Sequence, residues 1–266
     1  NVKLSHAMNA LPPLVAPELP IPALDDAGLA SANSALEGGS AEDVIGWAAD
    51  RFGDGLVMSS SFGAHSAVML HLVHRVAPRT PVVFVDTGHL FPETYRFADA
   101  LQRRFGLNLQ VYGPRMTAAR EEALHGRLWE QGDEGVDAYL QRNKVEPMQR
   151  ALRELGATAW MAGLRSRQTE HRAGLNRVGT QDGRVKIHPI LDWTLERAEA
   201  YIDEHELPYH PLFAEGYRSI GDVHSTLPTT DDMDPRDGRI LGKKRECGLH
   251  LPLTQEQNQS LKSSGL

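Results

Sequence analysis

Short apolar segments alternate with longer amphipathic segments through most of the chain, and this alternation limits the possible folds more than any other feature. The apolar runs are strand-like and lie at residues 56–58, 82–85, 108–112, 158–162 and 185–190. Segments with helical spacing lie between or after them, at 64–76, 93–105, 144–155 and 194–205. Strands separated by helices of this length form a parallel sheet covered by helices on both faces. The sequence therefore predicts an α/β fold with a doubly wound, mostly parallel sheet.

The chain is long enough for one large domain. Its 266 residues show no internal repeat and no second set of core segments, so we expect a single α/β domain at residues 41–250. Residues 1–40 carry five prolines between positions 12 and 22, and we expect this segment to be peripheral. A polar segment with prolines at about 228–250 is expected to be mobile, and residues 251–266 form a tail.

Charge and composition exclude several classes of function. A net charge of −7 argues against nucleic-acid binding and against binding to anionic membranes, so any anion must be bound by a local cluster of basic residues. No apolar run approaches the ~20 residues that span a bilayer. With one cysteine and no disulfide framework, we expect the protein in the cytoplasm.

Cys247 is the single cysteine and the strongest candidate for a nucleophile. One thiol cannot form an internal disulfide or a four-thiolate metal site. Three consecutive cations lie shortly before it in the run Lys243-Lys244-Arg245-Glu246-Cys247, and they favour the thiolate over the thiol. The alternative is an inert cysteine packed as a small apolar side chain. That alternative predicts apolar neighbours, whereas these neighbours are charged. His250 is close enough in sequence to share the site.

Two loops at the ends of predicted strands carry groups that suit a nucleotide. The first loop follows the strand at 56–58 and offers hydroxyls and backbone donors at a helix start, where an oxyanion or phosphate binds. Its candidate residues are Ser60, Ser61, Phe62 and Gly63. Serine is also a common helix cap, so this loop alone leaves both interpretations open. The second loop is Asp86-Thr87-Gly88, which ends the next strand at the same edge of the sheet.

Basic residues follow in a third loop and in two further segments. Gly163, Leu164 and Arg165 end the strand at 158–162 and begin a loop that also contains Arg167 and Arg172. Arginine at such a strand end can make paired contacts to phosphate or sulfate, although a solvated surface loop is the alternative. Further candidates are Lys144, Arg236 and Arg239, each of which could instead be a surface charge.

Five motifs in this order resemble the phosphoadenylyl sulfate reductase family, which has the adenine-nucleotide-binding α-hydrolase-like fold. They are Ser-Ser-Ser-Phe-Gly at 59–63, Asp-Thr-Gly-His-Leu-Phe-Pro-Glu-Thr-Tyr at 86–95, Lys-Val-Glu-Pro at 144–147, Gly-Leu-Arg at 163–165 and Glu-Cys-Gly-Leu-His at 246–250. The resemblance runs from about Trp47 to His250. It implies reduction of an activated sulfate, linked to an adenosine phosphate, to sulfite.

The resemblance also implies a role for each matching position. Cys247 would attack the sulfonyl sulfur and become an S-sulfocysteine. The serine loop would hold the phosphosulfate, and Asp86, Thr87 and Gly88 would border the nucleotide. The groups that neutralise phosphate and sulfate charge would be Lys144, Arg165, Arg236, Arg239 and His250. Arg167 and Arg172 are candidates for binding the group at the 3′ position of the nucleotide. The segment from Arg236 to His250 would close over the substrate as a lid.

The chain differs from the branch of this family that holds an iron–sulfur cluster. In that branch cysteine pairs stand where this chain has Tyr139-Leu140 and where Asp222 and Ser225 lie. Carboxylate and hydroxyl groups cannot replace soft thiolates as cluster ligands, so we expect no metal and no bound cofactor. The branch without a cluster uses the 3′-phosphorylated nucleotide, and its electron donor is reduced thioredoxin or glutaredoxin. We therefore expect 3′-phosphoadenylyl sulfate as substrate, in assimilatory sulfate reduction and cysteine biosynthesis, and a homodimer.

Three alternatives remain at this point. The first is an adenylyl sulfate reductase without a cluster. The second is an ATP pyrophosphatase-type protein of the same fold, which would need a Ser-Gly-Gly-x-Asp-Ser loop and would leave Cys247 without a role. The third is a nucleotide-binding regulator with no catalytic activity, which would tolerate Cys247→Ser.

Overall fold

The computed structural model describes residues 24–230, 233–234, 237–238 and 248–253. Three predicted site residues, Arg236, Arg239 and Cys247, lie outside these described residues, as does most of the predicted lid. No helix within the described ranges combines the length and the apolar character needed to cross a membrane.

Helices and strands alternate along the chain as the sequence predicts. The strands are β1 (Leu56–Ser59), β2 (Val82–Val85), β3 (Leu109–Tyr112), β4 (Ala159–Ala162), β5 (Val178–Gln181) and β6 (Arg184–Ile187). The helices are α1 (Asp26–Ala35), α2 (Ala41–Phe52), α3 (Ser66–Val76), α4 (Pro92–Phe105), α5 (Ala118–His125), α6 (Gly132–Leu140), α7 (Glu146–Glu154), α8 (Glu170–Ala173) and α9 (Leu195–Glu204). A π-helical turn, η3 (Gln141–Val145), joins α6 to α7.

The six strands form one sheet in the order β3-β2-β1-β4-β6-β5. All neighbouring pairs are parallel except β5 and β6, which are antiparallel. From β1 the chain moves outward in one direction through β2 and β3, and then returns to the other side of β1 with β4. The order therefore reverses between β1 and β4, which is where open α/β sheets bind ligands. The predicted doubly wound, mostly parallel sheet is confirmed.

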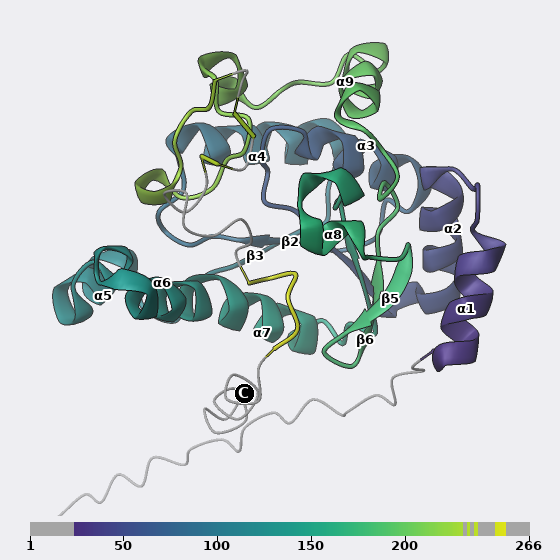
Figure 1. Ribbon diagram of the computed structural model, residues 1–266, viewed down its shortest axis with the longest axis horizontal. Coiled ribbons are helices and arrows are strands. Elements are labelled where there is room, and N and C mark those ends of the chain that lie inside the picture. Colours follow the sequence, from purple (N-terminus) through teal and green to yellow (C-terminus); the bar gives the residue numbers. More distant parts are fainter. Residues whose placement is uncertain (1–23, 231–232, 235–236, 239–247, 254–266) are drawn as a thin grey trace, which may run out of the picture.

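Side chains that alternate along each strand pack against different layers of helices. Leu56 and Met58 of β1 belong to the main core, which includes residues of α2, α3 and α4. Val57 points to the other face, where it packs with Trp160 of β4 and with buried residues of α7. Figure 1 shows α3 and α4 on one side of the sheet and α7 on the other. Because both faces are covered, the central strands β1, β2 and β4 are apolar at nearly every position.

The β5–β6 hairpin is a strand pair that the sequence analysis did not predict. A single strand at 185–190 was expected, but β6 ends at Ile187 and is preceded by β5. Asp182 and Gly183 form the turn between them, with φ angles of +51° and +76°. An Asp-Gly pair with positive φ at both positions is the preferred two-residue hairpin turn. The signal was present in the sequence, but the polar character of β5 concealed the strand.

The described part of the segment 1–40 contributes a helix to the domain. Asp25 accepts a hydrogen bond from the backbone of Gly28 and begins α1. Ala32 of α1 is buried in the main core, and the Asn33 side chain bonds the backbone N–H and carbonyl of Val178 on β5. Asp26–Ala35 of the segment 1–40 therefore packs against the sheet edge.

We expect Leu101→Ala to destabilise the protein by about 2–5 kcal/mol, because Leu101 of α4 is fully buried and its truncation leaves a cavity. Leu124→Ala is the matched control, since Leu124 is 60% exposed and its loss should change the free energy of unfolding by less than about 0.5 kcal/mol. Urea denaturation followed by circular dichroism measures both. Equal losses in the two variants would show that α4 does not pack as described.

Candidate active site

A pocket of about 720 Å³ lies over the carboxyl ends of β1, β2 and β4, at the point where the strand order reverses. Most of the predicted site residues line it. They are Ser60, Ser61, Gly63, Thr87, Lys144, Gly163, Leu164, Arg165, Arg172 and His250. Three described candidates, Phe62, Asp86 and Gly88, do not line the pocket. They shape the loops that do.

Phe62 fixes the shape of the loop after β1. Its φ angle is +49°, which is unusual for a residue with a side chain, and its ring is fully buried. The ring packs edge-on against Phe84 at 4.8 Å, so burial compensates the backbone strain. Ser60 Oγ accepts a hydrogen bond from the Phe62 backbone N–H. Ser60, Ser61 and Gly63 are thereby held at the pocket, whereas Phe62 itself points into the core.

Asp86 and Gly88 form a tight turn after β2. The Asp86 carboxylate accepts hydrogen bonds from the Gly88 backbone at 2.8 Å and from the Tyr95 hydroxyl at 2.6 Å. Gly88 has a φ of +77°, which a residue without a side chain adopts readily. These bonds direct Thr87, which is buried, toward the centre of the site. In this structure the Asp86 carboxylate therefore holds the shape of the loop.

Lys144 and Asp222 form a buried ion pair at the pocket wall. Lys144 Nζ lies 2.6 Å from Asp222 Oδ2, and both side chains are less than 10% exposed. Thr87 Oγ1 donates a hydrogen bond of 2.6 Å to the other carboxylate oxygen. Burial alone would raise the pKa of Asp222, but the Lys144 ammonium and the Thr87 hydroxyl outweigh it and lower the pKa to about 2. The sequence analysis did not predict Asp222 as a partner of Lys144.

The π-helical turn explains why Lys144 points to this position. The Glu146 backbone N–H bonds the carbonyl of Gln141, five residues earlier. Pro147 follows directly and has no N–H to continue a regular α-helical ladder. A wide turn of this kind is common at functional sites in helices. The Lys-Val-Glu-Pro motif thus places a lysine on an irregular turn inside one long helical segment. The predicted helix at 144–155 covers the end of this turn and α7, but it missed α6 and the first part of the turn.

Arg165 and Arg172 bring two guanidinium groups to the loop after β4. Gln168 Oε1 accepts from both the Arg165 backbone and the Arg172 side chain, and Arg165 Nη1 donates to the Thr194 carbonyl at 3.2 Å. Both arginines are more than nine-tenths buried. Burial lowers the pKa of Arg165, although a guanidinium remains charged in a protein. These residues supply fixed positive charge to the pocket.

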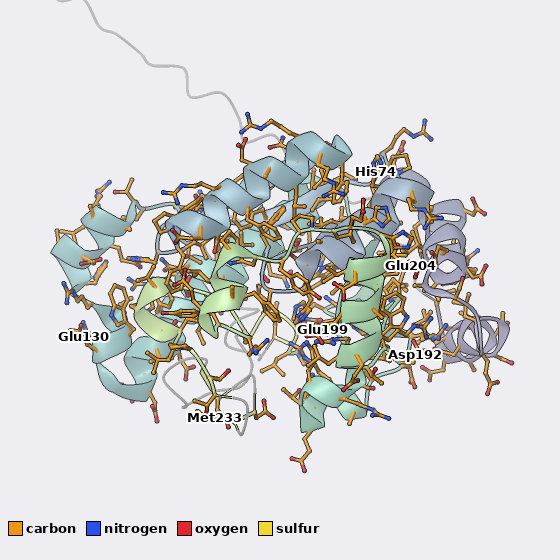
Figure 2. The ribbon with its side chains drawn as sticks, turned by 90° about the horizontal axis from the view of Figure 1, so that it is seen from above. His74, Glu130, Asp192, Glu199, Glu204 and Met233 are labelled. Atoms are coloured by element: carbon orange, nitrogen blue, oxygen red, sulfur yellow. The ribbon has the colours of Figure 1, made fainter. Side chains whose placement is uncertain are left out.

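His65 and Glu199 are pocket residues that the sequence analysis missed. His65 Nε2 lies 3.4 Å from Glu199 Oε1, and Figure 2 shows Glu199 on the side of α9 that faces the centre of the molecule. Burial, and then the charges of Arg165 and Arg218, lower the pKa of His65 to about 4. His65 is therefore neutral at pH 7. No local motif marks a lone histidine in a loop, which is why it was not identified.

The residues that follow Cys247 in the chain line the same pocket. Cys247 itself lies outside the described residues, as do Arg236 and Arg239. Leu249 packs against the cluster that contains Val57 and Trp160, and both Leu249 and His250 line the pocket. The Glu-Cys-Gly-Leu-His motif therefore ends at the site to which the other motifs contribute.

Aromatic rings pack together around Tyr139 and His224, in the two segments where the sequence analysis expects no cluster ligands. Tyr139 lies 4.9 Å from the ring of His224, and Trp129 stacks on His224 at 3.8 Å. His89 completes this group through an edge contact with Trp129. Burial lowers the pKa of His224 to about 4. Among the described residues, no group of three or more histidines, cysteines or carboxylates could hold a metal ion.

Comparisons with known proteins agree with this geometry. The family model of the phosphoadenosine phosphosulfate reductase domain matches residues 55–228. A phosphoadenosine 5′-phosphosulfate reductase from Thiocapsa roseopersicina is 54% identical over 226 residues, which covers 85% of this chain and 95% of the relative.

Two solved structures are also similar. The phosphoadenylyl-sulfate reductase from Candida auris, in a phosphate complex, matches with a TM-score of 0.69 and 33% identity over 77% of this chain and 98% of the other. The FMN adenylyltransferase of Candida glabrata in complex with ATP matches with a TM-score of 0.51 and 16% identity over 89% and 81% of the two chains. At that identity, the second similarity shows the fold alone.

We expect Asp222→Asn to cost about 3–5 kcal/mol at neutral pH, because it leaves the Lys144 ammonium buried without its carboxylate. The pKa of Asp222 is lowered from 3.8 to about 2 in the folded protein. The stabilising contribution of the carboxylate is therefore complete above the unfolded pKa and is lost as the pH falls toward 2. The difference in free energy of unfolding between wild type and variant, measured by urea denaturation, should shrink over that range.

Asp192→Asn is the control for this experiment. Asp192 pairs with Arg177 at 3.0 Å but is 49% exposed, so its removal should cost at most about 1 kcal/mol. A difference between wild type and Asp222→Asn that stays constant as the pH falls would contradict the assignment.

Proposed function

The chain belongs to the phosphoadenosine phosphosulfate reductase family, and on this premise we propose that it reduces 3′-phosphoadenylyl sulfate to sulfite and adenosine 3′,5′-bisphosphate. The observation that carries the proposal is the convergence of the separate motifs on one pocket. The serine loop, Lys144, the Gly-Leu-Arg loop and His250 come from distant parts of the chain and line a single cavity. Fixed cations in that cavity suit a substrate with several phosphate and sulfate charges.

The first step of the proposed reaction is a sulfonyl transfer to Cys247. The Cys247 thiolate attacks the sulfur of the substrate, a sulfur–sulfur bond forms, and the bond between that sulfur and the bridging phosphate oxygen breaks. The electron pair of the broken bond leaves with adenosine 3′,5′-bisphosphate. The enzyme is left with an S-sulfocysteine at Cys247. No proton transfer to the leaving group is needed, because a phosphate group is stable as an anion once cations surround it.

The described residues of the pocket would bind and stabilise this leaving group. Ser60, Ser61 and Gly63 offer hydroxyl and backbone donors at the start of α3, where anions bind. Lys144 has three N–H donors, and Asp222 takes one of them. Arg165 and Arg172, which follow β4, add positive charge to the same pocket. Arg236 and Arg239, which precede Cys247 in the sequence, would complete the charge balance.

The choice of the 3′-phosphorylated nucleotide is supported by the region around Tyr139. Tyr139 and His224 pack together where the cluster-containing branch has cysteines, and Asp222 is bound to Lys144. This arrangement supports the branch without a cluster, in which the protein binds no metal. Adenylyl sulfate is the alternative substrate. The alternative of an ATP pyrophosphatase rests on the shared fold alone and leaves Cys247 without a role.

The second step requires a dithiol from another protein. Sulfite leaves when a second thiolate attacks the Cys247 sulfur, and a mixed disulfide forms. This chain has no other cysteine, so the attacking thiol comes from another chain, either a partner of the thioredoxin or glutaredoxin type or Cys247 of a second subunit. The dithiol partner is favoured because its own second cysteine can resolve the mixed disulfide. The partner's second thiol then releases Cys247, and the dithiol has supplied two electrons. Such donors are kept reduced in the cytoplasm, where we place the protein in assimilatory sulfate reduction. The homodimer and the lid stay predictions.

We expect wild-type protein with a reduced dithiol donor to release sulfite faster from 3′-phosphoadenylyl sulfate than from adenylyl sulfate. Cys247→Ser should release none from either nucleotide while its nucleotide affinity stays within a few-fold, because it loses the nucleophile and keeps the pocket. Mass spectrometry of wild type incubated with substrate alone should show one added sulfonate. Substantial activity of Cys247→Ser would contradict the proposal that Cys247 is the nucleophile. Equal rates of sulfite release from both nucleotides would contradict the choice of substrate.

We expect a thioredoxin variant that lacks its second cysteine to form a covalent one-to-one complex with the sulfonated protein. The mixed disulfide cannot be resolved without that second thiol, so it accumulates. Non-reducing electrophoresis detects the complex, and Cys247→Ser is the control that should form none. Turnover at an undiminished rate without any dithiol protein would contradict the external donor.

A further inference from the structure

Lys186 is a buried lysine next to the pocket that none of the sequence motifs includes. It lies on β6 directly opposite Trp160 of β4, and it is only 4% exposed. Its ammonium group lies over the face of the Trp160 indole ring. Such a cation–π contact is strongest when both groups are desolvated. A buried ammonium is costly, and a protein retains one where its charge has a function or a partner.

The Lys186 ammonium also contacts the side chain of His250. Lys186 Nζ lies 3.3 Å from His250 Nδ1. An ammonium group has N–H donors and no acceptor, so Nδ1 must be the accepting nitrogen of the imidazole. His250 is then neutral, and its ring proton is on Nε2. Because Nδ1 accepts the hydrogen bond from Lys186, Nε2 carries the proton and can donate a hydrogen bond.

The backbone around His250 is held in place by neighbouring elements. Gln181 Nε2 at the end of β5 donates to the carbonyls of Leu249 and Leu251, on either side of His250. His171 Nε2 of α8 lies 3.3 Å from the His250 carbonyl. The His250 ring lies 5.5 Å from the Trp160 ring, which also carries Lys186. The ring is therefore positioned by its backbone and by Lys186 together.

We propose that Lys186 is a positioning residue that holds His250 as a neutral hydrogen-bond donor, with its proton on Nε2, for an anionic oxygen of the substrate. The inference rests on the proposed function, because it names the protonation form in which His250 serves that reaction. The leaving phosphate needs no proton, so His250 can donate one hydrogen bond to it throughout the step without exchanging protons.

The kinetic test is a double-mutant cycle on sulfite release. We expect His250→Ala to lower kcat by roughly 100-fold, the scale for loss of one donor to a developing anion. Lys186→Met keeps the length of the side chain and removes the ammonium, and we expect a loss of about 10-fold in kcat with little change in KM. Because Lys186 acts through His250, the double variant should be no slower than His250→Ala alone. Losses that simply multiply would overturn the proposal.

Arg184→Met is the matched control. Arg184 lies two residues before Lys186 on the same face of β6, and its side chain donates to the carbonyls of Ala157 and Asp182. It is a partly buried cation that contacts neither His250 nor the pocket lining. Its loss should lower thermal stability and leave kcat within about two-fold. A loss of kcat in Arg184→Met equal to that in Lys186→Met would show a general packing effect and would count against a specific role of Lys186.

A spectroscopic test reads the protonation form directly. In wild type labelled with ¹⁵N-histidine, the signals that disappear in His250→Gln belong to His250, and we expect them to report a neutral ring protonated on Nε2. In Lys186→Met we expect a shift toward a mixture of forms. A wild-type His250 protonated on Nδ1 would overturn the inference, even if Lys186→Met failed to fold. If wild type released no sulfite from either nucleotide, the proposed function would fail while this spectrum still tested the contact between Lys186 and His250.

Discussion

The buried ion pair between Lys144 and Asp222 joins the three segments that form one wall of the pocket. Lys144 comes from the π-helical turn, Thr87 from the loop after β2, and Asp222 from a segment that pairs with Leu90 through an isolated antiparallel bridge. Each of these segments lies outside a regular helix or strand. Burying two charges is costly, and their attraction offsets this cost only when hydrogen bonds complete the geometry, as Thr87 does here. The pair therefore specifies the arrangement of the site more than it adds stability.

The same pocket shows how an acidic protein can hold a polyanion. The chain has a net charge of −7, yet Lys144, Arg165 and Arg172 are all buried or nearly buried around one cavity. Parallel strands bring their carboxyl ends to one edge, so loops that are distant in sequence deliver their cations to the same place. Fixed side chains in a partly desolvated site interact with charge more strongly than mobile side chains in water. The overall charge of the chain therefore says little about what this site binds.

Local patterns in the sequence predicted the sheet and most of the pocket, because a buried strand or a strand-end motif consists of residues that are adjacent in the sequence. The predicted loops after β1, β2 and β4 do lie side by side. What was missed depends on contacts between distant residues. Lys186 contacts His250, which is 64 positions away, and nothing near Lys186 in the sequence indicates that contact. Phe62 and Asp86 were included because they belong to motifs, yet they shape loops and do not line the pocket.

Asp222 has an electrostatic role in this chain that the comparison with cluster-binding proteins did not indicate. The sequence analysis considered position 222 only as a place where a cysteine is missing, whereas the structure shows its carboxylate 2.6 Å from Lys144. A cysteine thiolate at that position would also have presented negative charge to the lysine. The carboxylate cannot replace a thiolate as an iron ligand, but it can balance the ammonium, and its lowered pKa keeps it charged at neutral pH. The need for an anion beside Lys144 thus follows from the burial of its ammonium, and in this chain the side chain of Asp222 supplies that anion.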